Sequence, residues 1–120
     1  MTAIKNPISD KKQIIYIAHP IGGDVEENIK KVLDIVRVLS ANQNIVPFAP
    51  YIVDVMALDD RNPQERAIGF DHNKALFQTG IIDEVWLFGD RISAGMATEI
   101  AWARRLNIPV IPKTEGTAKC

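Results

Sequence analysis

Residues 83–113 read DEVWLFGDRISAGMATEIAWARRLNIPVIPK, and the pattern of apolar residues in them predicts a strand, a helix and a second strand. The apolar run at residues 85–88 ends in glycine and aspartate, which is typical of a buried parallel strand that leads into a loop. Ser93 then precedes a segment whose apolar residues recur at helical spacing, namely Met96, Ile100, Ala103 and Leu106. Residues 110–111 begin the next strand. The stretch therefore predicts a β-α-β unit with a right-handed crossover.

Three polar side chains follow the first of these strands, where parallel sheets bind ligands. Asp90, Ser93 and Glu99 all come after its carboxyl end. We expect Glu99 in the first turn of the helix, where the positive end of the helix dipole favours an ionised carboxylate. Spacing alone favours a capping role for Glu99 over a catalytic one. Ser93 is also an ordinary N-cap, and that role is compatible with binding an anion.

The first part of the chain predicts a second ligand loop. Residues 13–18 (QIIYIA) are nearly continuously apolar, as a strand covered on both faces should be. Residues 19–24 (HPIGGD) end this strand, because proline lacks an N–H and Gly22 and Gly23 permit positive φ. We expect this loop to face the other one across the point where the strand order reverses. His19, which precedes a proline, is more simply a turn residue bonded to the backbone than a general base.

The remaining pattern completes the predicted fold. A helix follows from residue 25 to about residue 42, and residues 45–50 form a short strand that two prolines restrict to the sheet edge. Residues 51–63 are predicted to be a loop of about a dozen residues, and their apolar side chains predict a covered surface in a homo-oligomer, most simply a dimer. A third helix is expected at residues 64–79, after Pro63. The order β-α-β-α-β-α-β predicts an α/β fold, a flavodoxin-like three-layer sandwich with parallel strands in the order 2-1-3-4.

Composition and charge restrict the class of protein. The 120 residues are expected to form one domain, with a loosely held lead-in at residues 1–12. A net charge of -1 without a basic stripe excludes nucleic-acid polymers as partners. Cys120 is the only cysteine, which rules out a disulfide framework and fits a reducing cytoplasm. No apolar run approaches the roughly 20 residues that cross a bilayer, so we expect a soluble, cytoplasmic protein without membrane partners.

Motifs for cofactors and for other catalytic classes are absent from the sequence. Gly22 and Gly23 stand without a G-x-G-x-x-G pattern or a P-loop lysine, so neither a dinucleotide nor ATP is indicated and no cofactor is expected. His19 and His72 are the only histidines, and no carboxylates cluster at ligand spacing, which argues against a metal site. Ser93 does not sit in a G-x-S-x-G elbow, which excludes that type of serine hydrolase.

Three segments together carry a family resemblance: YIAHPIGG at residues 16–23, DEVWLFGD at residues 83–90 and SAGMATEIAWA at residues 93–103. They resemble the nucleoside 2-deoxyribosyltransferase family and its relatives, the 2'-deoxynucleoside 5'-phosphate N-hydrolases. The resemblance implies that Glu99 is the nucleophile, that Tyr16 orients it, and that Ser93 and Gly95 belong to a phosphate-binding loop. It favours the catalytic role of Glu99 over the capping role.

The chain departs from the family pattern at two positions. The sugar-binding aspartate of the family aligns near Ala75, and the nearest candidate here is Asp71. The arginine of the family's first loop is missing, with Asp24 in its vicinity. The resemblance nevertheless implies an N-glycosidase for a (deoxy)nucleoside or its 5'-monophosphate. The substrate-binding residues would be His19, Gly22, Gly23, Asp71, Asp90, Ser93 and Gly95. The alternatives are a deoxyribosyltransferase and a non-catalytic protein that binds nucleotide derivatives.

Overall fold

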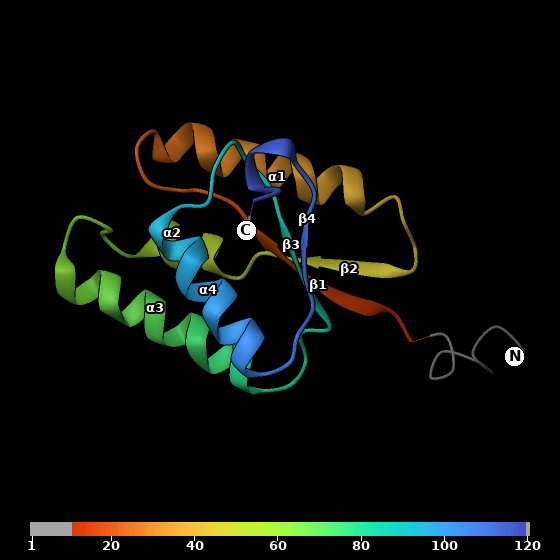
Figure 1. The fold of residues 1–120 in the computed structure, drawn as a ribbon. Coiled ribbons are helices and arrows are strands. Elements are labelled where there is room, and N and C mark those ends of the chain that lie inside the picture. Colours follow the sequence, from red (N-terminus) through yellow and green to blue (C-terminus); the bar gives the residue numbers. More distant parts are fainter. Residues whose placement is uncertain (1–10, 120) are drawn as a thin grey trace, which may run out of the picture.

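A four-stranded parallel sheet forms the middle layer of the protein, with helices on both of its faces (Figure 1). The structure is a computed structural model that describes residues 11–119. Its elements are β1 (Gln13–Ala18), α1 (Val25–Leu39), β2 (Ile45–Phe48), α2 (Tyr51–Ala57), α3 (Pro63–Gln78), β3 (Glu84–Leu87), α4 (Ala94–Arg105), β4 (Val110–Pro112) and the short 3-10 helix η2 (Glu115–Thr117). The strands lie in the order β2-β1-β3-β4, and every neighbouring pair is parallel. The predicted flavodoxin-like three-layer fold with order 2-1-3-4 is confirmed.

The central strand β1 contributes to two separate cores because successive side chains of a strand point to opposite faces. Ile15 and Ile17 pack on the face that α1 covers. Tyr16 and Ala18 pack on the other face, where α3 and α4 contribute Phe77, Met96, Ile100 and Ala103. All four β1 residues are 0% exposed, which explains why this strand has a continuous apolar run rather than an alternating one. Tyr16 therefore points toward the helices that carry the candidate site.

The segment after β2 is a helix, and the prediction that residues 51–63 form a loop was wrong for its first half. The helix α2 occupies Tyr51–Ala57. It is held by Ile52, which is 8% exposed, and by the ring of Tyr51, whose centroid lies 5.7 Å from that of Tyr16. Residues 51, 52 and 55 have the i, i+1, i+4 spacing of one helical face, a signal that the neighbouring prolines and aspartates obscured.

The third predicted helix is confirmed to within one residue at each end. In α3, Pro63 is the first helical residue, and the side chain of Asn62 caps it by accepting hydrogen bonds from the N–H groups of Gln64 and Glu65 at 2.9 and 3.3 Å. Gly80 follows the helix with φ +82, a conformation that favours glycine.

Two expectations concern the ends of the chain and the membrane. The loosely held lead-in falls almost wholly on residues 1–10, which lie outside the described residues. Among the helices of residues 11–119, none has the length and apolar character needed to cross a membrane.

Candidate active site

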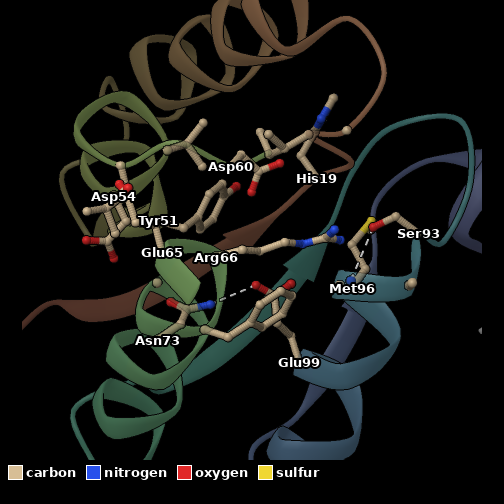
Figure 2. Close-up of a pocket in the computed structure, with 18 of the residues that line it drawn as sticks. His19, Tyr51, Asp54, Asp60, Glu65, Arg66, Asn73, Ser93, Met96 and Glu99 are labelled. Atoms are coloured by element: carbon tan, nitrogen blue, oxygen red, sulfur yellow. Dashed lines mark hydrogen bonds between the residues drawn. The ribbon is translucent and has the colours of Figure 1, made fainter. Parts of the chain in front are cut away.

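A cleft of about 290 Å³ opens at the carboxyl ends of β1 and β3 (Figure 2). Its walls come from the loop after β1, from α2 and α3, and from the loop and first turns of α4. Four of the predicted substrate-binding residues line the walls of this cleft: His19, Gly22, Ser93 and Gly95. This is the edge of the sheet where ligands were expected.

Glu99 and Asn73 line the floor of the cleft, and they form a buried hydrogen-bond network with Tyr16, which lies beneath the lining. The hydroxyl of Tyr16 donates to Oε2 of Glu99. The amide Nδ2 of Asn73 donates to the Tyr16 hydroxyl at 2.6 Å and to the same Oε2 at 2.9 Å. All three residues are buried: Tyr16 is 0% exposed, Glu99 8% and Asn73 5%. Oε1 of Glu99 has no hydrogen-bond partner among residues 11–119, so one carboxyl oxygen is anchored and the other is free.

The position of Glu99 on α4 differs from the expected one. The helix begins at Ala94, with Ser93 as its N-cap, so Glu99 is its sixth residue and lies in the second turn. Its carboxyl is bonded to side chains of β1 and α3 and not to N–H groups at the helix start, so the expected first-turn position and the capping role were wrong. Glu99 shares the buried face of α4 with Met96, Ile100 and Ala103, at the helical spacing visible in the sequence.

Burial controls the proton affinity of this network. The pKa of Glu99 rises from 4.5 to about 7, because burial penalises its charged form more than the hydrogen bonds from Tyr16 and Asn73 stabilise it. The pKa of Tyr16 rises well above its ordinary value of 10.0, first through burial and then through the charge of Glu99. Tyr16 therefore keeps its proton and donates it in a hydrogen bond, while Glu99 changes charge near neutral pH.

The start of α4 forms one end of the cleft and is suited to an anion. The hydroxyl of Ser93 accepts a hydrogen bond from the N–H of Met96 at 3.2 Å, which is the predicted N-cap. Arg66 from α3 and Arg91 from the loop before α4 also line the cleft. Figure 2 shows the guanidinium group of Arg66 extending across the cleft toward Ser93 and Met96. The cleft thus contains positive charge, although the loop after β1 lacks the arginine found in the family that the sequence resembles.

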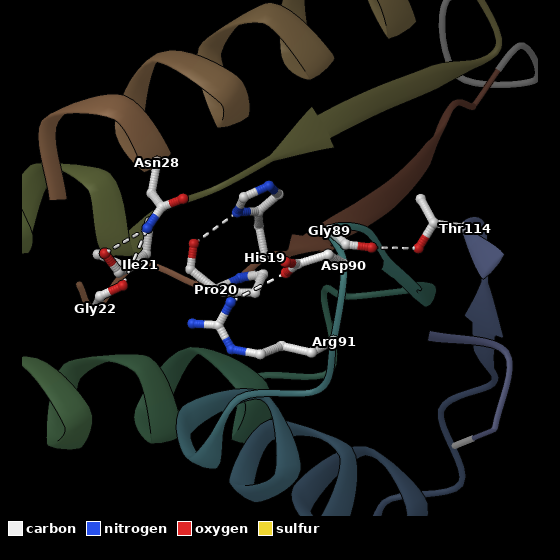
Figure 3. A network of polar contacts seen from close by, with 9 residues as sticks. All are labelled: His19, Pro20, Ile21, Gly22, Asn28, Gly89, Asp90, Arg91 and Thr114. Atoms are coloured by element: carbon white, nitrogen blue, oxygen red, sulfur yellow. Dashed lines mark hydrogen bonds and ion pairs between the residues drawn. The ribbon is translucent and has the colours of Figure 1, made fainter. Parts of the chain in front are cut away.

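The loop after β1 is fixed by contacts within itself and with α1 (Figure 3). His19 is 8% exposed and its Nδ1–H donates to the carbonyl of Pro20 at 2.6 Å, while burial lowers its pKa and favours the neutral ring. Asn28 of α1 donates to the carbonyls of Ile21 and Gly22 at 2.9 and 3.1 Å. The turn interpretation of His19 fits these contacts.

Three residues near this loop do not face the cleft. Gly23 has φ +91 and leads into α1, but it is not among the lining residues. Asp24 is the N-cap of α1 and accepts from the N–H of Glu27 at 3.2 Å. Asp90 is exposed and accepts from Arg91 at 3.0 Å, so its side chain lies outside the lining as well.

The structure replaces one candidate on α3 by another. Asp71 and Ala75 are both exposed, and neither lines the cleft. Asn73 lies there instead, and it was missed because it stands in the polar run at residues 71–74. The sequence did contain a signal for Asn73. One side of the helix carries residues at helical spacing, namely Arg66, Gly69, Asn73 and Phe77.

The structure shows no candidate metal site around the second histidine. His72 is half exposed and lies 3.1 Å from Asp54, and no group of three potential metal ligands occurs in residues 11–119.

Comparisons with known proteins give a matching family model and a solved structure with a similar fold. A family model described as a domain of unknown function (DUF7768) matches residues 13–113. A comparison with curated proteins gives no match. Among solved structures, a 2-deoxyribosyltransferase from the psychrotolerant bacterium Bacillus psychrosaccharolyticus is similar, with a TM-score of 0.61 and 22% sequence identity. The similarity covers 82% of this chain and 70% of that chain, and at this identity it shows the fold.

Proposed function

The chain belongs to the family described as a domain of unknown function (DUF7768), and we propose that it is an N-glycosidase that cleaves the base from a nucleoside or a nucleoside 5'-monophosphate. One observation carries the proposal. Glu99 is a buried carboxyl with one oxygen anchored by Tyr16 and Asn73 and the other free, at the floor of a cleft of about 290 Å³. A cleft of this volume matches the lower range of small-molecule sites.

Glu99 is suited to nucleophilic attack on the anomeric carbon of a sugar. In its ionised form, Oε1 forms a bond to this carbon while the bond to the base breaks and its electron pair leaves with the base. The resulting ester links the sugar to Glu99. Water then attacks the anomeric carbon: its oxygen bonds to the sugar, one of its protons goes to the departed base, and the carboxylate of Glu99 is regenerated. Tyr16 keeps the carboxyl group oriented through Oε2 during both steps.

The 5'-phosphate of a nucleotide would lie at the start of α4. The helix offers free N–H groups and a positive dipole end there, and Arg66 and Arg91 add positive charge. Asp54 and Glu65 lie on the opposite side of the cleft from Ser93, where an anion would be repelled (Figure 2). These charges support a ligand whose anionic group faces Ser93.

The phosphate assignment is tested by two substitutions of the same residue. Ser93→Ala should weaken monophosphate affinity by roughly 10- to 150-fold, which is the value of a hydrogen bond to a charged group, and should leave nucleoside affinity nearly unchanged. Ser93→Gly is the matched control because glycine retains most of the N-cap stability while lacking the hydroxyl. Equal losses of monophosphate affinity in both variants at fixed salt support the assignment. A wild type that prefers the bare nucleoside contradicts it.

The activity itself is tested by incubating the protein with a panel of nucleosides and nucleoside monophosphates. Chromatography should detect released base with wild type and none with Glu99→Gln. A protein that binds a nucleotide yet releases no base over hours is a binding protein, and that result would overturn the N-glycosidase proposal.

A second candidate function is base exchange, which the fold similarity to a 2-deoxyribosyltransferase favours. The two activities share the glycosyl-enzyme ester and differ in whether water or a second base attacks it. Incubation of a deoxynucleoside with a different free base separates them. A new nucleoside in the products indicates transfer, and accumulation of free sugar indicates hydrolysis.

A further inference from the structure

The turn at residues 114–117, which follows β4, packs against the loop that leads from β3 to α4. The hydroxyl of Thr114 donates to the carbonyl of Gly89 at 2.7 Å, although 25 positions separate the two residues. Gly116 approaches the backbone of Asp90 so closely that a Cβ on Gly116 would lie 2.3 Å from the carbonyl oxygen of Asp90. The turn is therefore in direct contact with the loop, through one hydrogen bond and one close backbone approach.

The turn is itself firmly held, so it can support the loop. Thr117 is buried, and its hydroxyl lies 3.0 Å from the carbonyl of Thr114 and 3.3 Å from the carbonyl of Leu87. The N–H of Lys113 donates to the same carbonyl of Leu87 at 2.9 Å. These bonds anchor the turn to the last residue of β3, which is where the loop begins.

The loop is enclosed from two sides. In Figure 3, Gly89 lies between Thr114 on one side and His19 and Pro20 on the other. A Cβ on Gly89 would lie 2.6 Å from Cδ of Pro20, so this second side has no room for a further carbon atom either. The loop cannot move away from the turn without moving the loop after β1. Its position therefore depends on the turn.

This loop carries to the cleft two of the groups that are proposed to bind an anion. Arg91 comes directly after Asp90 and lines the cleft, and its Nη1 lies 3.0 Å from Oδ1 of Asp90. Ser93 is the N-cap of α4 and lines the cleft as well. Hydrogen bonds to a charged group depend on distance and angle, so the backbone position of Gly89 and Asp90 affects how well these groups meet an anion.

We propose that Thr114 and Gly116 are positioning residues for the anionic group of the substrate, and that they act through the loop that carries Arg91 and Ser93. The inference rests on the proposed function, which places a 5'-phosphate at the start of α4. It gives a role in substrate affinity to a turn that is not part of the cleft lining. A displaced loop should weaken the binding of a 5'-monophosphate and spare the nucleoside, which lacks the anionic group.

The test is calorimetric titration at fixed salt with adenosine, guanosine, cytidine, uridine and their 5'-monophosphates. The pair that wild type binds most tightly is then titrated against the variants. Gly116→Ala should weaken monophosphate affinity by about 10-fold or more, the value of one hydrogen bond to a charged group, and should change nucleoside affinity by less than about twofold. Thr114→Val removes the hydroxyl alone and should weaken monophosphate affinity by about 3- to 10-fold.

Two controls separate positioning from a general loss of stability. Thr114→Ser retains the hydroxyl and should bind the monophosphate within about twofold of wild type. Gly80→Ala introduces strain at φ +82 in open space before the amino end of β3, so it should lower stability and leave both affinities unchanged. If Gly116→Ala does not fold, the two Thr114 variants decide the test.

Amide hydrogen exchange without ligand checks the contact itself. Relative to β1, residues 88–93 should exchange faster in Gly116→Ala and Thr114→Val than in wild type, and at the wild-type rate in Gly80→Ala. Unchanged exchange overturns the inference, as does a ratio of monophosphate to nucleoside affinity that stays at the wild-type value in both variants. A wild type that binds none of the monophosphates overturns it as well.

Failure of the proposed function gives a different result. A wild type that binds the monophosphate but releases no base contradicts the N-glycosidase proposal. The affinity ratios of the same variants then still decide whether Thr114 and Gly116 position the anion-binding loop.

Discussion

Glu99 is buried and accepts hydrogen bonds from two neutral donors, and its burial decides how its charge depends on pH. Burial raises its pKa from 4.5 to about 7. The unfolded chain binds this proton less tightly than the folded protein does. The contribution of Glu99 to stability is therefore fully present below about pH 4.5 and is lost as pH rises through about 7, a difference of about 3 kcal/mol.

Replacing Glu99 by glutamine should separate stability from activity. Glu99→Gln carries no charge, so at pH 8 its free energy of unfolding should exceed that of wild type by about 1 to 3 kcal/mol, with little difference at pH 4.5. Base release should fall by about 10³-fold or more because the nucleophile is gone. Urea denaturation at both pH values gives the first result and chromatography gives the second.

The control for this substitution is Glu65→Gln, which removes a carboxylate from the cleft wall rather than from its floor. Its unfolding free energy should follow the wild-type dependence on pH. A Glu99→Gln variant that is less stable than wild type at pH 8, or that keeps full activity, contradicts the assigned burial or the assigned role.

The hydrogen bond from Tyr16 should be visible in the pH dependence of the rate. In wild type, kcat/KM should rise with a midpoint near pH 7, because attack needs the ionised carboxylate. Tyr16→Phe removes a bond that lowers the pKa of Glu99, so its midpoint should move up by about one pH unit. Tyr51→Phe is the control, since the Tyr51 hydroxyl bonds a backbone carbonyl instead. Equal midpoints in wild type and Tyr16→Phe would show that this bond does not act on Glu99.

At the scale of elements, the two ligand loops are held together where Gly89 meets Pro20. Gly89 has φ +97, and a Cβ placed there would lie 2.6 Å from Cδ of Pro20. Both the backbone conformation and the close approach require glycine at this position. The loop after β3 thus supports the loop that carries His19 and Gly22 to the cleft.

Two glycine-to-alanine substitutions separate strain from crowding. Gly80→Ala introduces a side chain at φ +82 into open space, so only backbone strain of about 1 kcal/mol is expected. Gly89→Ala adds the overlap with Pro20 and should lower the free energy of unfolding by about 2 kcal/mol or more. Urea denaturation compares the two. Similar losses in both variants would mean that the loops move apart at no cost.

At the scale of the whole molecule, α2 presents apolar side chains to the outside. Val53 and Met56 are 70% and 71% exposed, while Tyr51 and Ile52 of the same helix face the interior. The oligomer predicted from this segment stays a prediction, and the structure locates the surface that it would use. An exposed apolar patch on a helix that borders the cleft is typical of an interface.

We expect a dimer at micromolar concentration that depends on this surface. Sedimentation of wild type should give about twice the 13.4 kDa of one chain, and Val53→Asp with Met56→Lys should give one chain. Val38→Asp is the control, since Val38 is 72% exposed on α1 at the other face of the sheet. A single species of one chain in wild type would contradict the prediction.

The sequence alone determined the fold, and it placed Tyr16 on a buried strand and Glu99 on the helix after β3, although one turn too early. Strand and helix periods are local properties, so the apolar pattern of residues 93–106 was sufficient for the buried face of α4, and the succession of strands and helices along the whole chain predicted the sheet order. The residue types and spacing of segments that resemble a known family then indicated a pairing between β1 and α4. That pairing is present as the bond from Tyr16 to Glu99, although 83 positions separate them.

Only the tertiary structure decided which part of α3 reaches the cleft. Asn73 meets Tyr16 across 57 positions and Glu99 across 26, and its place between them depends on how α3 rotates against α4 and β1. The residues on both sides of Asn73 in the chain are also polar, so the sequence pattern did not show which of them faces the cleft. Asp71 was therefore favoured as the substrate-binding residue, and Asn73 was missed. The same packing turned residues 51–57 into a helix and brought Arg66 and Arg91 to the end of the cleft where no arginine was expected. Contacts between segments that are distant in the chain set these positions, so the local pattern of apolar and polar residues does not predict them.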